Sequence, residues 1–153
     1  MNKQEDPMDK FSRPVMTKDY KLGKLFQFEP RRDPKKPGRE LVVTYDERFP
    51  AIPGFQIHYS YYVRFLEKGN AAGNHYHIKK QELFIPISGS FKVNLEDIET
   101  KEKEELILKA EDCPVFYVNS KTAHRTIANE ENSVLLVLAT SPNNNQDEYH
   151  YDL

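Results

Sequence analysis

The sequence predicts an all-β domain, a sandwich or a barrel, and three observations lead to that prediction. Residues 55–66 alternate between apolar and polar side chains over twelve positions, and a period of two is typical of a half-buried strand. Further short apolar runs follow, separated by turn residues such as Ser88-Gly89 and Asn119-Ser120. No segment keeps a period of 3.6, so the pattern indicates many short strands and no long amphipathic helix.

The first forty residues show the weakest strand pattern. Residues 1–20 are polar and charged and contain two prolines, so we expect a flexible arm or a strand donated to a neighbouring molecule. Residues 28–40 combine three prolines with a basic run, which predicts a loop. A basic run of this kind is most often a solvated surface, although it carries the charge to hold a phosphate. Residues 21–153 are expected to form a single domain.

The rest of the chain is expected to consist of strands joined by short turns. The candidate strands are residues 41–46, 55–66, 82–87, 90–97, 105–110, 114–118, 124–128 and 133–140. Many short strands at this spacing are typical of a sandwich or barrel. The polar end, residues 141–153, either folds back over the body or stays mobile.

Composition excludes several classes of partner. Twenty-two basic and 24 acidic residues give a formal net charge of -2, which provides no drive toward nucleic acid or an anionic membrane. Cys113 is the only cysteine, so a disulfide within the chain is impossible and a reducing cytoplasm is expected. No apolar stretch approaches the roughly 20 residues of a membrane span, and the first residues lack the apolar run of a signal peptide.

Two histidines stand one residue apart in GNAAGNHYHIKKQELFIPISG, residues 69–89. On a strand, His75 and His77 point to the same face, and a hairpin would bring Glu82 beside them. His124 follows a later strand. Such histidines are sometimes only hydrogen-bonded core residues. Together, however, three imidazoles and a carboxylate suit a divalent ion such as iron, manganese, nickel, zinc or copper, and the spacing does not name which one.

The spacing of these residues resembles the first motif of the cupin superfamily. That motif is a glycine, five residues, His-x-His, three or four residues, a glutamate, six residues and a glycine, and Gly69, His75, His77, Glu82 and Gly89 match it. His124 occupies the histidine of the looser second motif, although NSKTA replaces the usual proline and glycine before it. The resemblance implies a double-stranded β-helix, or cupin jelly roll, with four metal ligands inside the barrel: His75, His77, Glu82 and His124.

A narrower resemblance runs from about Gly38 to the end of the chain. FQIHYSYYVRF, HYHIKKQE, SGSFKVNLED, VFYV, SVLLVLAT and DEYHYDL are similar to the WxcM-like sugar-nucleotide cupins, which include dTDP-4-keto-6-deoxyhexose 3,4-ketoisomerases. This resemblance implies acid and base groups from His75 and His77, with Lys79 as a further candidate, normally without a metal. The family usually has glutamine where this chain has Glu82, and a glutamate restores the fourth metal ligand. Related cupins of capsule-sugar enzymes carry a similar GNHYH stretch and can hold zinc.

Two functions follow as expectations. The first is a cytoplasmic sugar-nucleotide isomerase or epimerase of polysaccharide biosynthesis, which moves a proton on a 4-keto-6-deoxy sugar through an enediolate. A divalent ion (Zn, Fe, Mn or Ni), or none, would assist it. The alternative is a metal-dependent cupin of another class, either an Fe(II) oxygenase or a non-catalytic small-molecule binder. A homodimer is expected in either case, because cupins often pair through strands whose edges are otherwise open.

Two further groups of residues are weaker candidates. Arg31, Arg32, Lys35 and Lys36 have the charge to contact a nucleotide diphosphate. Tyr59 and Tyr61 lie on the apolar face of residues 55–66, where aromatic core is the default interpretation. A tyrosine on a barrel strand beside the site would otherwise offer its hydroxyl to a sugar.

Overall fold

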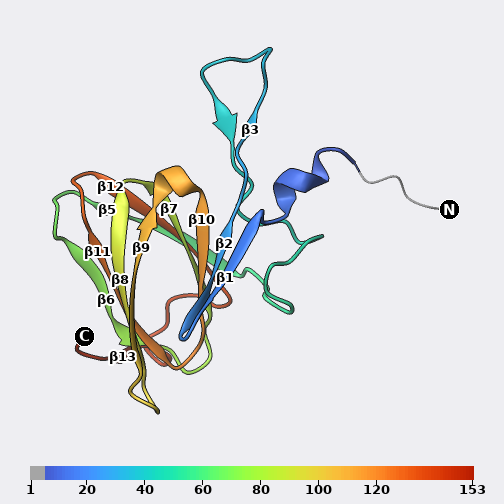
Figure 1. Cartoon of the computed structure of the whole chain (residues 1–153). Helices are drawn as coiled ribbons and strands as arrows, with labels where there is room; N and C mark the ends of the chain where they lie inside the picture. The colour runs from blue at the N-terminus through green and yellow to red at the C-terminus, as the bar shows by residue number, and fades with distance from the viewer. Residues whose placement is uncertain (1–5) are drawn as a thin grey trace.

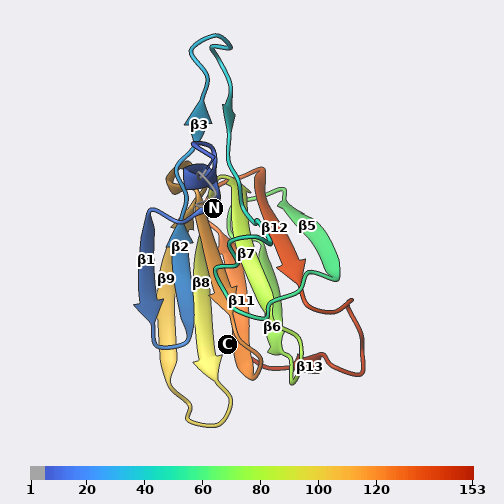
Figure 2. The same cartoon turned by 90° about the vertical axis from the view of Figure 1, so that its right-hand side faces the viewer.

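The computed structural model describes residues 6–153, and it consists of two antiparallel sheets packed face to face (Figures 1 and 2). The six-stranded sheet has the order β1-β2-β10-β7-β12-β5 and contains β1 Met16–Tyr20, β2 Gly23–Gln27, β5 Tyr59–Phe65, β7 Glu82–Ser88, β10 Pro114–Val118 and β12 Ser133–Ala139. The five-stranded sheet has the order β13-β6-β11-β8-β9 and contains β6 Ala71–Tyr76, β8 Ser90–Asp97, β9 Lys103–Lys109, β11 Thr122–Ala128 and β13 Tyr149–His150.

Regular structure outside these sheets is limited in the described part of the chain. β3 Arg31–Arg32 pairs with β4 Glu40–Leu41, and two short 3-10 helices cover Asp9–Ser12 and Ala110–Asp112. The described strand pairs are all antiparallel. The all-β prediction is therefore confirmed. Among residues 6–153 there is no helix long and apolar enough to span a membrane.

The main core lies between the two sheets. Alternate residues of β8, among them Phe91, Val93 and Leu95, are buried against side chains from the opposite sheet. The rings of Phe65 and Phe91, one from each sheet, meet edge to face with centroids 5.1 Å apart. Burying one such ring stabilises the fold by about 1.5–3 kcal/mol. The core therefore fixes how the two sheets are placed, and the polar site described below is built on that placement.

A second apolar cluster joins β2, β7, β10 and β12 to the long connection before β5. It contains Phe26, Phe28, Phe55, Leu83, Ile85, Val115 and Leu138, with Val42 and Tyr45 packed against it. Residues 41–46, expected as a strand, pair only through Leu41 in β4, and the remainder forms no strand. Their apolar side chains pack on this cluster, so the apolar pattern reflects burial without a strand pairing.

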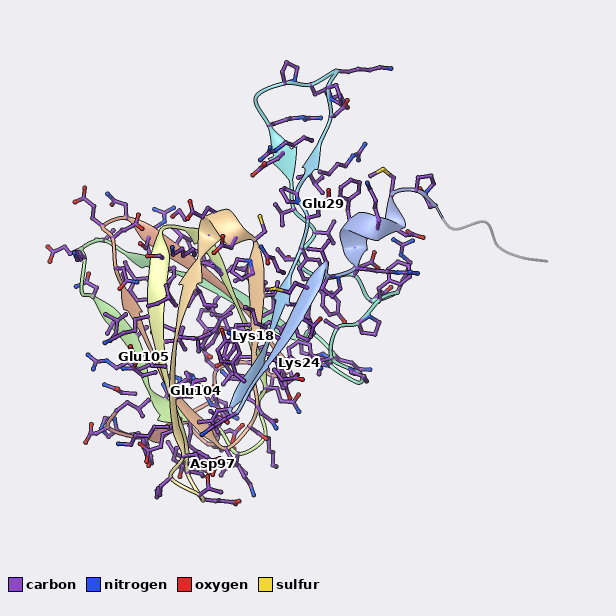
Figure 3. The ribbon with its side chains drawn as sticks, viewed as in Figure 1. Lys18, Lys24, Glu29, Asp97, Glu104 and Glu105 are labelled. Atoms are coloured by element: carbon purple, nitrogen blue, oxygen red, sulfur yellow. The ribbon has the colours of Figure 1, made fainter. Side chains whose placement is uncertain are left out.

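The N-terminal hairpin continues the six-stranded sheet. β1 lies within the segment expected to be an arm, residues 1–20, and pairs along its length with β2 of the same chain. Glu104 of β9 holds the turn of this hairpin, because its carboxylate accepts hydrogen bonds from the amides of Lys21 (3.2 Å) and Leu22 (2.9 Å) (Figure 3). Residues 1–5 lie outside the described residues.

The two ends of the barrel differ in what they present. The β3–β4 hairpin projects from one end, and β13 lies at the other (Figures 1 and 2). β13 pairs with β6, so that His150 lies opposite His75. This register places His75 and the residues that follow it at the end of the barrel away from the hairpin.

Candidate active site

The two sheets bring three histidines and a glutamate together at the β13 end of the barrel. His75 lies near the end of β6, His77 follows this strand, and Glu82 begins β7. His124 of β11 is the register partner of His75. One ring nitrogen from each of the three imidazoles lies within 4.8 Å of the others. Glu82 Oε2 lies 3.2 Å from His124 Nε2 and 3.8 Å from His77 Nε2.

Gly73 allows β6 to approach β11 closely. Its φ angle is +102°, and a Cβ at this position would lie 2.5 Å from the carbonyl oxygen of His124. The register also shifts between His124 and Arg125, as a β-bulge does. Only glycine fits both the backbone conformation and the contact. The close approach leaves the rings of His75 and His124 edge to face, with centroids 4.7 Å apart.

Each imidazole is fixed through its Nδ1 atom. His77 Nδ1 donates to the carbonyl oxygen of Asp147 (2.6 Å), and His124 Nδ1 donates to that of Thr122 (3.1 Å). His75 Nδ1 lies 2.9 Å from Glu148 Oε1. Because these oxygens accept hydrogen bonds, Nδ1 carries a proton in each ring, and a ring that is neutral then keeps its lone pair on Nε2. This is the arrangement in which outer oxygen atoms orient histidines for proton transfer or for metal binding.

Burial sets the charges of these groups. It lowers the pKa of His75 to about 3, with further lowering by the neighbouring His124 and His77. Burial also lowers the pKa of His77, against the opposing effect of Glu82. For Glu82, burial alone raises the pKa, but His124, His77 and Lys80 outweigh it and bring the value to about 2. At neutral pH the site therefore contains neutral His75 and His77 beside an ionised Glu82.

Two buried atoms of the site have no hydrogen-bond partner among residues 6–153. They are His77 Nε2 and Glu82 Oε2, which face each other at 3.8 Å. Buried polar atoms are normally paired, and two acceptors cannot pair with one another. A proton, a hydroxyl group or a metal ion would satisfy both. Three imidazoles and a carboxylate fit a divalent first-row ion, so the residues present fit a metal.

The other oxygen of Glu82 faces two different groups. The hydroxyl of Tyr61, on β5, donates to Glu82 Oε1 at 3.3 Å. Lys80 Nζ lies 3.5 Å from the same oxygen and donates to Asn143 Oδ1 at 2.6 Å. Burial, followed by the negative charge of Glu82, raises the pKa of Tyr61 far above its usual value. Tyr61 therefore remains a protonated donor at physiological pH.

The C-terminal segment folds back over the site. The Asp147 carboxylate accepts hydrogen bonds from the backbone amides of Ile78, Lys79 and Lys80, at 2.8 to 3.3 Å. Beyond it, the ring of Tyr149 stacks on Tyr76 with centroids 5.1 Å apart. Of the two outcomes expected for this end, the structure shows the first. The segment both holds the turn after β6 and supplies the oxygen atoms that orient His75 and His77.

The structure separates the remaining predicted residues from the cluster. The side chain of Lys79 is exposed, whereas that of its neighbour Lys80 is buried beside Glu82. Arg31 and Lys36 line a surface cavity of about 270 Å³ in the β3–β4 hairpin, together with Asp33, Arg39, Glu40 and Leu41. This hairpin lies at the opposite end of the barrel (Figure 1), so within one chain its cations do not approach the histidines.

Sequence reasoning missed three residues that contact the cluster: Lys80, Asp147 and Glu148. For Lys80 a signal exists, because a residue two positions before Glu82 in an extended chain points to the same side. Asp147 and Glu148 lie in a polar tail with no periodic pattern. Their contacts with residues 75–80 span most of the domain, and no local pattern reports them.

Comparison with protein-family models matches residues 18–153 to the family described as FdtA: WxcM-like, C-terminal. The chain belongs to the FdtA family. This match covers most of the chain and confirms the family suggested by the His-x-His motif and the flanking stretches. A search of curated protein sequences finds no significant match.

Solved structures similar to this FdtA-family chain have the cupin jelly roll of RmlC-like proteins. The RmlC epimerase of Mycobacterium tuberculosis has a TM-score of 0.74 and 15% identity, over 89% of this chain and 72% of that one. A 3,4-ketoisomerase from Helicobacter canadensis has a TM-score of 0.69 and 21% identity, over 82% and 88%. A histidine-to-asparagine variant of the 3,4-ketoisomerase QdtA from Thermoanaerobacterium thermosaccharolyticum, in complex with TDP-4-keto-6-deoxyglucose, has a TM-score of 0.67 and 22% identity, over 85% and 88%. These likenesses confirm the predicted fold.

Proposed function

We propose that this FdtA-family protein is a sugar-nucleotide 3,4-ketoisomerase that acts on a TDP-4-keto-6-deoxy sugar. The observation that carries the proposal is the pair of neutral imidazoles, His75 and His77, whose protonated Nδ1 atoms are held by the C-terminal segment. Their Nε2 lone pairs are thus available as bases. The family match and the complex of the QdtA variant with TDP-4-keto-6-deoxyglucose support the choice of substrate.

The reaction needs one proton to leave a carbon atom and one to return to its neighbour. The 4-keto group acidifies the hydrogen on C3, and a neutral imidazole removes that proton to give an enediolate across C3 and C4. A proton is then delivered to C4. The hydroxyl proton of O3 is lost and O4 gains one, so the carbonyl moves from C4 to C3 without any net oxidation.

His75 is the better placed of the two imidazoles to meet a substrate. Its side chain is 19% exposed, against 5% for His77. Its Nδ1 atom donates to the Glu148 carboxylate, and this contact stabilises the imidazolium that forms when Nε2 takes a proton. His77 is the second acid or base group. Lys79, whose side chain is exposed, has no part in this scheme.

A divalent ion, when bound, would be held by His75, His77, Glu82 and His124 and would supply Lewis-acid stabilisation of the enediolate oxygen. The hydroxyl of Tyr61 donates to Glu82 Oε1 and so helps to orient this carboxylate. A homodimer and a cytoplasmic location remain predictions. The metal-dependent oxygenase and the non-catalytic binder also remain predictions.

The experiment is to incubate the full chain with TDP-4-keto-6-deoxyglucose in D2O and follow the sugar by NMR. We expect a 3-keto product that carries deuterium at C4. His75→Asn removes the basic nitrogen and is expected to reduce product formation by about a thousandfold. Unchanged substrate with the wild-type protein would contradict the proposed function. Full activity of His75→Asn would instead remove this histidine from the mechanism.

A further inference from the structure

We propose that Lys80 is a built-in counter-ion of Glu82 that competes with a divalent metal ion for the site. The inference concerns the same residues as the proposed function, but it does not depend on the isomerase reaction. It starts from a contrast between neighbours. Lys79 is exposed, whereas Lys80 is only 3% exposed and directed at the carboxylate expected to be the fourth metal ligand.

The contacts of Lys80 define its role. Its ammonium lies 3.5 Å from Glu82 Oε1 and donates to Asn143 Oδ1 at 2.6 Å. Its backbone amide donates to Asp147 Oδ2 at 3.0 Å. Backbone and side chain are both held, so the ammonium has a fixed position. A buried lysine is rare unless it is paired, and Glu82 is the acid that pairs with it.

The two oxygens of Glu82 are divided between two kinds of partner. Oε1 faces the Lys80 ammonium and the Tyr61 hydroxyl. Oε2 faces His124 and His77, which is where a metal ion shared with the imidazoles would bind. A metal ion on Oε2 would therefore lie a few ångströms from a fixed positive charge on the other side of the same carboxylate.

The balance of charge decides the affinity. Glu82 is the carboxylate that faces the Nε2 atoms of His77 and His124, and Lys80 pairs with it. The other carboxylate at the cluster, Glu148, contacts Nδ1 of His75. A divalent cation bound to Glu82 would share this carboxylate with Lys80, and the ammonium would repel the cation across a poorly screened, buried distance. Three imidazoles favour a metal ion, and Lys80 opposes it.

The test is metal binding by the chelator-treated full chain, measured by titration calorimetry with Zn2+ alone and with Ni2+ alone. We expect Lys80→Gln to bind each ion at least about tenfold more tightly than the wild-type chain, with one ion per chain. Lys79→Gln removes the same charge from the adjacent exposed position and serves as the matched control, with an expected change below about twofold. Lys80→Arg keeps the cation and is expected to stay as weak as wild type.

A loss of structure in Lys80→Gln is separated from a change in affinity by thermal unfolding with and without Zn2+. Under the proposal, Zn2+ raises the Tm of Lys80→Gln more than that of the wild-type chain, even if the variant starts lower. An equal or smaller rise, or tight one-to-one binding by the wild-type chain that Lys80→Gln does not improve, overturns the proposal. No sugar is present, so a failure of the isomerase hypothesis leaves this result unaffected.

Discussion

Two ion pairs at opposite ends of the barrel show that distance alone does not measure the strength of a charge interaction. In the β3–β4 hairpin, Arg32 Nε lies 2.9 Å from Glu40 Oε2, and the side chains are 76% and 43% exposed. In the site, Lys80 and Glu82 are 3.5 Å apart and only 3% and 2% exposed. Water and salt screen the first pair, whereas the second is poorly screened. Although the contact between Lys80 and Glu82 is the longer one, the loss of one of its partners therefore destabilises the fold more.

Because the groups of the site are buried, we expect a substitution that removes a basic ring nitrogen there to abolish most of the activity even when the fold is kept. His77→Asn retains a side-chain amide that can donate to the Asp147 carbonyl but has no basic ring nitrogen. We expect the rate of ketoisomerisation to fall by about a thousandfold while the fold is kept. Product formation measured by NMR, beside a circular dichroism spectrum like that of wild type, checks this. Wild-type turnover in the variant would show that His77 takes no part in the chemistry.

Removal of Lys80 from the buried ion pair tests how much this pair contributes to stability. Lys80→Ala leaves the carboxylate of Glu82 buried without its counter-ion, and we expect unfolding to become easier by about 3–5 kcal/mol. Urea denaturation at neutral pH measures this difference. The double variant Lys80→Ala/Glu82→Gln, which removes both charges, should recover part of the loss. No recovery would mean that Lys80 stabilises the fold by packing and not by charge.

Two glycines extend the same contrast to the backbone. Gly73 in the site and Gly38 in the hairpin loop both have positive φ angles, +102° and +83°, but only Gly73 has neighbouring atoms where a Cβ would lie. Gly38→Ala should cost about 1 kcal/mol of stability, from the backbone conformation alone. Gly73→Ala should cost about 3 kcal/mol, because the Cβ also meets the His124 carbonyl. If Gly73→Ala and Gly38→Ala unfold at the same urea concentration, that result would argue against the close approach of β6 to β11.

The smallest effect is expected at the exposed ion pair. Arg32→Ala removes a 2.9 Å contact with Glu40, yet we expect a change in stability below about 0.5 kcal/mol at physiological salt. The comparison fails if this substitution destabilises the protein as much as Lys80→Ala does. Thermal unfolding at low and high salt would reveal any contribution, since an exposed pair weakens as the salt concentration rises.

The strands of the barrel were predictable where each strand buries one face. β8 and β10 coincide with the predicted residues 90–97 and 114–118, β7 and β12 each differ from the prediction by one residue, and β5 begins later than the predicted residue 55. For residues 1–20 a strand was expected only as one donated to a neighbouring molecule, and the pairing of β1 with β2 of the same chain was not predicted. Four of the five residues of β1 are exposed, and an exposed strand has no alternating pattern. Its position depends on the free edge of β2 and on Glu104, which lies more than eighty residues away.

The cluster of four residues was predictable because three of them occupy a short motif whose spacing is set by one turn between two strands. The residues that form hydrogen bonds or ion pairs with these four were not predicted from the sequence. Sequence favoured Lys79 over Lys80, although the period-two rule counted back from Glu82 indicates Lys80. The Nδ1 atoms of His77 and His124 donate to main-chain oxygens, those of Asp147 and Thr122 respectively. Nδ1 of His75 contacts the carboxylate of Glu148. Main-chain oxygens leave no trace in residue identity.

The return of the last residues over the barrel has a practical consequence for anyone who makes this protein. Asp147 and Glu148 are attached to the body through a short segment after β12, and they set which nitrogen of His75 and His77 bears hydrogen. A chain shortened before position 147 would lose β13 and the hydrogen bonds of Asp147 to the turn after β6, but it would keep every residue of the main core between the sheets. Its imidazoles would be free to rotate and exchange tautomers, so that an inactive preparation would look well folded.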